Sequence, residues 1–202
     1  MLRRLFYFFV CTTVCVLVSF DSGACQAETD TSFPVFNDPS YTIEFHVLKQ
    51  LNGEEDVHFA TLSLMHLKGG LKKILFLDTL EIFRPSIELA DYNGDGIKDI
   101  LVLYQSSARS NLTYHLYLVN NKEHHVKRVE GFEEICNPEY DAINKFIISF
   151  VLTGVNYYAF YIIDDTPKVI DLGNGFDDDR TDVTNSKYKK AISRIRKQLG
   201  RE

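Results

Sequence analysis

The chain has 202 residues, of which 28 are acidic and 22 are basic, giving a formal net charge of −6. Without residues 1–27, which contain Arg3, Arg4 and Asp21, 27 acidic and 20 basic residues remain, a balance that disfavours general nucleic-acid binding and suits a cation or a basic partner. The remaining chain of about 175 residues is long enough to bury the core of one domain without dense disulfides.

The N-terminus has the layout of a secretory signal peptide. Arg3 and Arg4 precede an apolar stretch over residues 5–20, and small residues follow up to Ala24 and Ala27. The apolar stretch is shorter than the roughly 20 residues that span a bilayer, so an uncleaved anchor is the alternative interpretation. We interpret residues 1–27 as a signal peptide cleaved after Ala24 or Ala27, which predicts an exported, periplasmic protein.

The sequence around Cys25 allows a second interpretation of this region. The run from Ser22 to Cys25 resembles a bacterial lipobox, in which the cysteine is acylated, with Ser22 in place of the usual branched apolar residue. Cys11 and Cys15 lie in the signal, which leaves Cys25 and Cys136 able to form one disulfide that their spacing does not establish. If Cys25 is removed or lipidated, Cys136 is a lone thiol, which is more often buried than reactive.

Residues 28–180 are expected to form one β domain. Segments rich in branched and aromatic residues, separated by Gly, Asn, Asp or Pro clusters, predict strands at 41–51, 57–65, 73–77, 87–90, 100–105, 113–119, 145–152, 156–163 and 168–172. In the first segment Tyr41, Ile43, Phe45 and Val47 alternate with polar residues, which predicts one buried face. The pattern predicts a mostly β fold of antiparallel meanders, arranged as a sandwich, a barrel or a small propeller-like domain.

Oxygen-bearing side chains occupy alternate positions of a loop over residues 91–99. Asp91, Asn93, Asp95 and Asp99 stand at positions 1, 3, 5 and 9, and Ile97 offers its backbone carbonyl at position 7. Calcium takes roughly six to eight oxygen ligands, and alternate residues of a tightly turning backbone can direct their oxygens at one centre. The pattern therefore predicts a Ca²⁺ site with Asp91, Asn93, Asp95, Ile97 and Asp99 as metal ligands, Asp99 binding directly or through water.

The flanks of this loop exclude an EF-hand. The twelfth position counted from Asp91 is Val102, where an EF-hand requires a bidentate Glu, and both flanks are predicted strands. Gly96 permits the sharp turn. The alternative is a plain Asn-Gly and Asp-Gly hairpin turn, which does not require carboxylates at positions 1, 5 and 9. The expected role of the ion is structural, because no open coordination position or second catalytic group accompanies it.

Residues 181–202 are expected to contain an amphipathic helix. Tyr188, Ile192, Ile195 and Leu199 recur at steps of four, three and four, which predicts a helix over residues 186–199. The opposite face carries Lys187, Lys189, Lys190, Arg194, Arg196 and Lys197. A helix of this kind packs on the sheet with a solvated cationic face, or lies on an anionic membrane; the narrow apolar stripe without Trp or Phe favours packing.

Catalytic motifs are missing from the sequence. It contains no nucleophile elbow, His-Glu-x-x-His, phosphate loop or Cys-x-x-Cys. Of the six histidines only His124 and His125 are adjacent, in a charged segment where an exposed loop is favoured over a metal site. We therefore expect a protein that is not an enzyme.

The calcium loop between two predicted strands resembles the loops of integrin-type FG-GAP and VCBS repeats, here present once. Followed by segments 114–119, 132–137, 145–149 and 157–163, it looks like bacterial periplasmic propeller-like proteins over roughly residues 85–172. Relatives in that group bind calcium and act as inhibitors or immunity proteins against lysozyme-like peptidoglycan hydrolases. No stretch matches an inhibitory loop, so the contact residues are not carried over.

The resemblance implies an exported calcium-binding module whose loops bind a protein partner, a peptidoglycan hydrolase, by occlusion rather than chemistry. No nucleic acid is expected as a partner, and a membrane only if Cys25 is lipidated or the signal is uncleaved. The alternative is a calcium-dependent envelope or surface protein that binds carbohydrate or matrix, as repeat-bearing relatives do. Additional loop copies would favour this alternative, and the sequence contains none.

Overall fold

The computed structural model describes residues 30–48, 58–107, 109–178 and 185–201. The signal peptide expected over residues 1–27, including Cys25, lies outside the described residues. Cys136 is half-buried, and burial raises the pKa of its thiol. In chain order the described elements are β1 (Thr31–Val35), β2 (Asp38–Leu48), β3 (His58–Lys68), β4 (Leu71–Ile82), β5 (Ile87–Ala90), β6 (Asp99–Ser106), β7 (Leu112–Asn120), β8 (His125–Arg128), the 3₁₀ helix η1 (Phe132–Glu134), β9 (Pro138–Asp141), β10 (Phe146–Val151), β11 (Asn156–Ile163), β12 (Val169–Asp171), β13 (Phe176–Asp178) and α1 (Ser186–Gln198).

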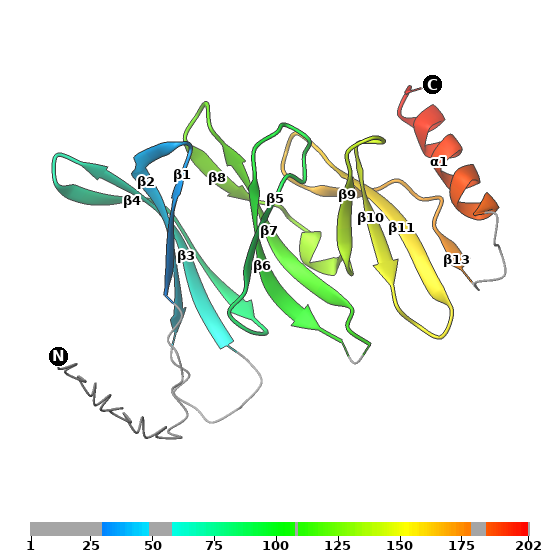
Figure 1. Ribbon diagram of the computed structural model, residues 1–202, viewed down its shortest axis with the longest axis horizontal. Coiled ribbons are helices and arrows are strands. Elements are labelled where there is room, and N and C mark those ends of the chain that lie inside the picture. Colours follow the sequence, from blue (N-terminus) through cyan, green and yellow to red (C-terminus); the bar gives the residue numbers. More distant parts are fainter. Residues whose placement is uncertain (1–29, 49–57, 108, 179–184, 202) are drawn as a thin grey trace, which may run out of the picture.

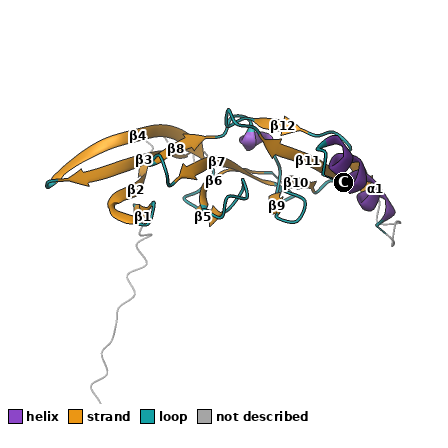
Figure 2. Ribbon diagram, turned by 90° about the horizontal axis from the view of Figure 1, so that it is seen from above, coloured by secondary structure: helices purple, strands orange, loops and turns teal. Residues whose placement is uncertain are grey.

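The strands form three antiparallel sheets that follow one another along the molecule (Figure 1). The first sheet has the order β1-β2-β3-β4, and the central sheet the order β5-β6-β7-β8. In the third sheet, ordered β12-β11-β10-β9, β13 pairs with the part of β11 that β12 leaves free. Figure 2 shows β1, β5 and β9 along one side of the molecule and β4, β8 and β12 along the other. Each sheet is an open meander, and the described residues form no closed barrel or complete propeller.

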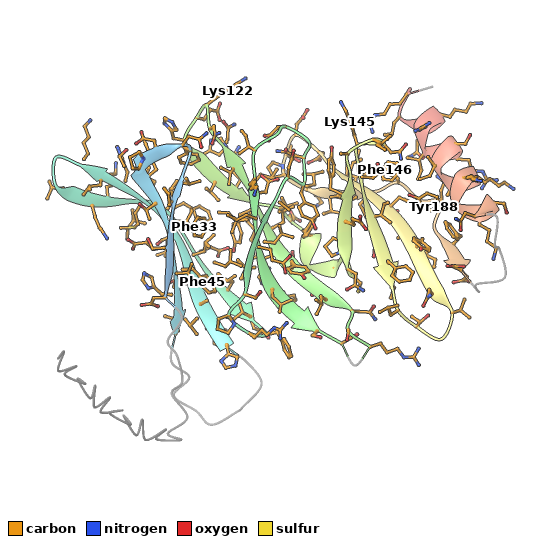
Figure 3. The ribbon with its side chains drawn as sticks, viewed as in Figure 1. Phe33, Phe45, Lys122, Lys145, Phe146 and Tyr188 are labelled. Carbon is orange, nitrogen blue, oxygen red and sulfur yellow. The ribbon has the colours of Figure 1, made fainter. Side chains whose placement is uncertain are left out.

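The first core lies between the first and central sheets. Ile43 and Phe45 of β2 are fully buried in it, and Tyr41 and Val47 pack against it, so the predicted alternation along this strand is confirmed. Phe33 of β1 adds a further ring, and Figure 3 shows it beside β2, which carries Phe45. Burial on one face alone explains why polar residues alternate with apolar residues in β2.

The central sheet is buried on both faces. In β6, Ile100 and Val102 belong to the first core, whereas Leu101 and Leu103 belong to a second core shared with the third sheet. Because successive side chains of a strand point to opposite faces, a strand covered on both sides needs a continuous apolar run. The uninterrupted run at the start of β6 therefore encodes its central position.

The third core lies between the third sheet and α1. Phe146 and Phe160 of the sheet are buried against Ala191 and Ile195 of the helix. Tyr188, labelled with Phe146 in Figure 3, faces the sheet with its ring centroid 6.2 Å from that of Phe160. The predicted apolar stripe thus packs on the sheet. Within the described part of the chain, no helix has the length and apolar character needed to span a bilayer.

The predicted mostly β fold with a C-terminal amphipathic helix is confirmed. Each predicted strand segment overlaps an observed strand, and the bounds predicted for β5 and β11 are those observed. Four strands were not predicted: β1, β8, β9 and β13. His125, expected in an exposed loop, begins β8 and is half-buried, so that expectation was wrong for this residue.

A buried histidine connects the first sheet to the central sheet. His115 of β7 lies with Nε2 3.1 Å from the backbone oxygen of Glu81 in β4 and with Nδ1 2.9 Å from the Arg128 guanidinium. Because an arginine can only donate, Nδ1 is the acceptor and Nε2 carries the proton that is donated to Glu81. His115 is therefore neutral in this arrangement.

The charged groups around this histidine are shared by three elements. Arg128 of β8 lies 3.3 Å from the Asp78 carboxylate of β4 and 3.7 Å from the Glu133 carboxylate of η1. The Tyr117 hydroxyl donates to the same Asp78 oxygen at 2.8 Å. Burial, followed by the charge of Arg128, lowers the pKa of His115, and the two carboxylates offset only part of this effect.

Acid is expected to weaken this junction through His115. Because its folded pKa lies below the usual value of 6.5, the unfolded chain takes up the proton first, and stability is lost as the pH falls below that value. The unfolding free energy, measured by urea titration at pH 7.5 and pH 5.0, should fall by more in the wild type than in His115→Gln. The glutamine retains a donor for Glu81 but does not titrate. Equal decreases in the two proteins would contradict this assignment.

Candidate metal centre

The candidate metal centre is the loop that joins β5 to β6. The two strands pair antiparallel from Ala90 opposite Asp99 to Ile87 opposite Val102, so the predicted strand, loop, strand unit is confirmed. Gly94 has φ of 75° and Gly96 has φ of 83°, in the left-handed region that favours glycine. The tight turn expected at Gly96 is therefore present, and Gly94 forms a second one.

Asp91 holds the first half of the loop in its turn. One carboxylate oxygen accepts the Gly94 N–H at 2.6 Å, and the other accepts the Gly96 N–H at 2.9 Å. A carboxylate that accepts backbone N–H groups in this way replaces the hydrogen bonds that a turning backbone cannot make with itself. Asp91 is consequently directed toward the interior of the loop and not toward bulk solvent.

Asn93 and Asp95 continue the same pattern. The Asn93 amide oxygen accepts the Asp95 N–H at 3.0 Å, and the Asp95 carboxylate accepts the Ile97 N–H at 2.8 Å. The Asn93 amide nitrogen also donates to the second Asp95 oxygen at 3.1 Å. The Ile97 side chain packs against the first core, so its backbone oxygen is the donor that it can offer to an ion.

Asp99 is fully buried at the base of the loop. One of its oxygens accepts the Tyr92 N–H at 2.9 Å, and the other accepts the Val119 N–H from β7 at 3.0 Å. Burial raises the pKa of this carboxyl to about 6, the two hydrogen bonds oppose that rise, and the charges of Asp95 and Asp91 add to it. The carboxylate is thus short of positive charge.

The donor set fits a hard cation by type. It consists only of oxygens, from three carboxylates, one amide and one backbone carbonyl, which suits Ca²⁺ rather than softer metals. An oxygen that accepts one N–H keeps a second lone pair for an ion. Among the described residues, no three acidic, His or Cys side chains converge closely enough to form a metal-binding group. The loop therefore presents the predicted ligands in sequence around its turn rather than gathered at one point.

Two tyrosines attach the loop to the third sheet, and the sequence did not indicate either contact. The Tyr92 hydroxyl donates to the backbone oxygen of Pro138 in β9 at 2.7 Å, and its ring packs edge-on against Phe132. The Tyr140 hydroxyl lies directly over Gly94, leaving no room for a Cβ. A large aromatic residue within a polar loop was the one available signal for Tyr92, whereas nothing in the sequence pairs Tyr140 with this loop.

A groove of about 580 Å³ borders the loop on the side of the first sheet. Residues 33–39, at the β1–β2 turn, and residues 96–98 of the loop line it, together with Leu89, Ile100 and Val119. The loop thus forms part of a recessed, partly apolar surface, so a change in its rigidity would reach that surface.

Comparison with known protein families identified no matching family, and neither curated proteins nor solved structures gave a match.

Gly94 offers a test of the attachment between the loop and the third sheet. In the presence of chelator, Gly94→Ala should lower the unfolding free energy by about 2 kcal/mol or more. The left-handed backbone costs an alanine roughly 1 to 2 kcal/mol, and the new methyl overlaps the Tyr140 hydroxyl. Gly96→Ala, with similar φ but open space around its Cβ position, should show the backbone cost alone.

Adding Tyr140→Phe should restore part of the unfolding free energy that Gly94→Ala loses and none of that lost by Gly96→Ala. Urea unfolding in a double-mutant cycle measures both effects. The same loss in both glycine variants, with no recovery by Tyr140→Phe, would show that Tyr140 does not constrain the loop.

Proposed function

We propose that this protein is an exported calcium-binding module that binds another protein, and that it acts as an inhibitor or immunity protein against a lysozyme-like peptidoglycan hydrolase. It works by covering its target and performs no catalysis. The observation that carries the calcium part is the buried Asp99 carboxylate, which closes a loop of oxygen donors and is short of positive charge. The partner rests on the resemblance of the loop and the strands that follow it.

A bound ion would relieve a specific electrostatic cost. At neutral pH Asp99 is ionised in a buried position, and Asp91 and Asp95 repel it. Burial of a charge without a counter-charge is costly, and a divalent cation compensates it more strongly than two neutral N–H groups. Asp91, Asn93, Asp95, Ile97 and Asp99 would hold the ion, which supplies charge and rigidity.

The loop contacts all three parts of the surface on which a partner would dock, so an ion that makes the loop rigid would also make that surface more rigid. It belongs to the central sheet, contacts the third sheet through Tyr92 and Tyr140, and lines the groove toward the first sheet. A preorganised surface loses less conformational entropy when it docks. Calcium would therefore favour binding of a partner at this face without contacting the partner itself.

The three meanders support a propeller-like arrangement. The first and central sheets each have four strands in sequence order, and the third has β9 to β12 in sequence order with β13 as a fifth strand. The first strands of the three sheets share one side of the molecule (Figure 2). We assign them as three blades of an open propeller-like domain. In this assignment β12 and β13 together take the place of a single fourth strand.

Calcium binding is tested by Asp95→Ala. With the affinity of about 10⁻⁴ to 10⁻³ M that is typical of extracellular sites, calcium at a hundredfold excess over Kd should raise the unfolding free energy by about 2.7 kcal/mol. The variant should lose this gain and lie within about 1 kcal/mol of the wild type in chelator, because its side chain makes exposed hydrogen bonds.

Asp165→Ala, which removes an exposed aspartate remote in sequence from the loop, should retain the calcium response. Calorimetric titration supplies the affinity directly. If all three proteins unfold alike with and without calcium, the loop is a hairpin turn and not a metal site.

The partner is tested by retention from periplasmic extract on the chain from residue 28, with calcium and with chelator, followed by mass spectrometry. Capture of a peptidoglycan hydrolase in calcium, together with loss of its activity on cell-wall fragments in proportion to added protein, is the expected result. Asp95→Ala should weaken both effects. Binding to glycans or envelope material with no hydrolase retained would replace this proposal with the carbohydrate-binding or matrix-binding alternative.

A further inference from the structure

The β3–β4 hairpin projects from the end of the molecule opposite α1 (Figures 1 and 2). Its two-residue turn, Gly69 and Gly70, has positive φ at both residues, and the strands pair outward to Lys68 opposite Leu71. Every residue from 67 to 75 is exposed. We call residues 67–75 the hairpin tip.

Large apolar side chains cover the hairpin tip. Leu71 is 77% exposed, Ile74 54% and Leu67 48%, and Leu75 and Leu77 continue this surface along β4. A register shift places Leu75 as an extra residue between the pairs made by Ile74 and Phe76, which adds to the apolar surface. The cross-strand pairs place Leu67, Ile74 and Leu77 on one face of the hairpin and Leu71 on the other. Exposed leucines are ordinary one at a time, but apolar side chains on both faces of a projecting element indicate an interaction site.

The charge of the hairpin tip is opposite to that of the chain. The chain has a net charge of −6, yet residues 67–75 contain three lysines and no acidic residue. Lys72 lies 2.9 Å from Glu44 in an ion pair. Lys68 and Lys73 have no ion-pair partner among the described residues, so two uncompensated positive charges flank the apolar side chains.

We propose that the hairpin tip docks onto an anionic lipid bilayer, with Leu67 and Leu71 entering the interface and Lys68 and Lys73 contacting acidic headgroups. Leucine side chains with flanking lysines match the two layers that a bilayer surface presents, apolar chains beneath negative charge. This contact is independent of the groove beside the metal centre and of any lipid at Cys25.

Charge and shape favour a bilayer over other occupants. Lys72 and Lys73 lie on β4, the edge strand of the first sheet, and edge lysines are a common device against edge-to-edge pairing with a second copy. A narrow projecting hairpin buries little area on a flat protein surface, whereas a fluid bilayer surrounds it on all sides.

The test uses flotation with vesicles of phosphatidylcholine alone and with a third phosphatidylglycerol. The chain from residue 28, which contains every residue of the three cores, and the full chain are compared with their variants. Binding to anionic vesicles should exceed binding to neutral vesicles at least tenfold and should weaken as salt rises. Lys68→Gln with Lys73→Gln should reduce it about 30-fold, since each lysine near an anionic surface contributes about 1 kcal/mol. Leu67→Ser with Leu71→Ser should reduce it at least tenfold.

Matched controls come from the other end of the molecule. Ile143→Ser removes an apolar side chain that is 85% exposed, and Lys190→Gln with Lys197→Gln removes two exposed charges of α1. Both should bind as the wild type does, and all variants should retain the urea midpoint of the wild type. Binding lost in the α1 variant but retained in the hairpin variants would overturn the proposal. So would vesicle binding unaffected by either hairpin variant, or a dimer in sedimentation that the leucine variant dissociates without any vesicle binding.

Discussion

Burial of the central sheet on both faces is the constraint on which the other parts of this structure depend. Ile100 and Val102 face one core, and Leu101 and Leu103 face the other, so neither neighbouring sheet can leave without exposing half of β6. An open row of sheets also has two outermost faces. Helix α1 covers the face at the third sheet, whereas the first sheet ends in a hairpin with exposed leucines. The two ends of the molecule are therefore chemically different.

The burial of β6 also determines the electrostatics of the loop that precedes it. Asp99 is the first residue of β6, and the strand enters the core at once, so this carboxylate is carried into a region with little water. Two N–H groups satisfy its hydrogen bonding but leave its charge uncompensated. An aspartate at this position costs stability unless something positive accompanies it. This is the physical basis of the proposal that the acidic loop above Asp99 binds a cation.

The strands that the sequence predicted are those whose own side chains require a buried face. Alternation in β2 and the continuous apolar run in β6 both report burial directly, and the stripe on α1 does the same at helical spacing. The four strands that were missed lie at sheet edges, where pairing to one neighbour supplies the order: β1 contains Pro34, β9 begins with Pro138, and β13 lies in an acidic segment. For the site, the spacing from Asp91 to Asp99 predicted the loop and its flanking strands. The contacts of Tyr140 and Val119 with it depend on how distant strands are brought together, which local pattern does not encode.

When no ion is present, acid changes the stability of this fold in opposite directions at His115 and at Asp99. Protonation of His115 prevents its Nδ1 from accepting the Arg128 hydrogen bond, which destabilises the protein. Protonation of Asp99 removes a buried charge and so stabilises the calcium-free protein. A bound cation would change the second effect, since metal ligands must be deprotonated and calcium would lower the pKa of Asp99. Acidification of a calcium-loaded protein would then weaken the junction between the first and central sheets, and protons would compete with the ion for Asp99. These two centres lie on neighbouring strands of the same buried sheet, so calcium and pH would act together on the face that carries the groove.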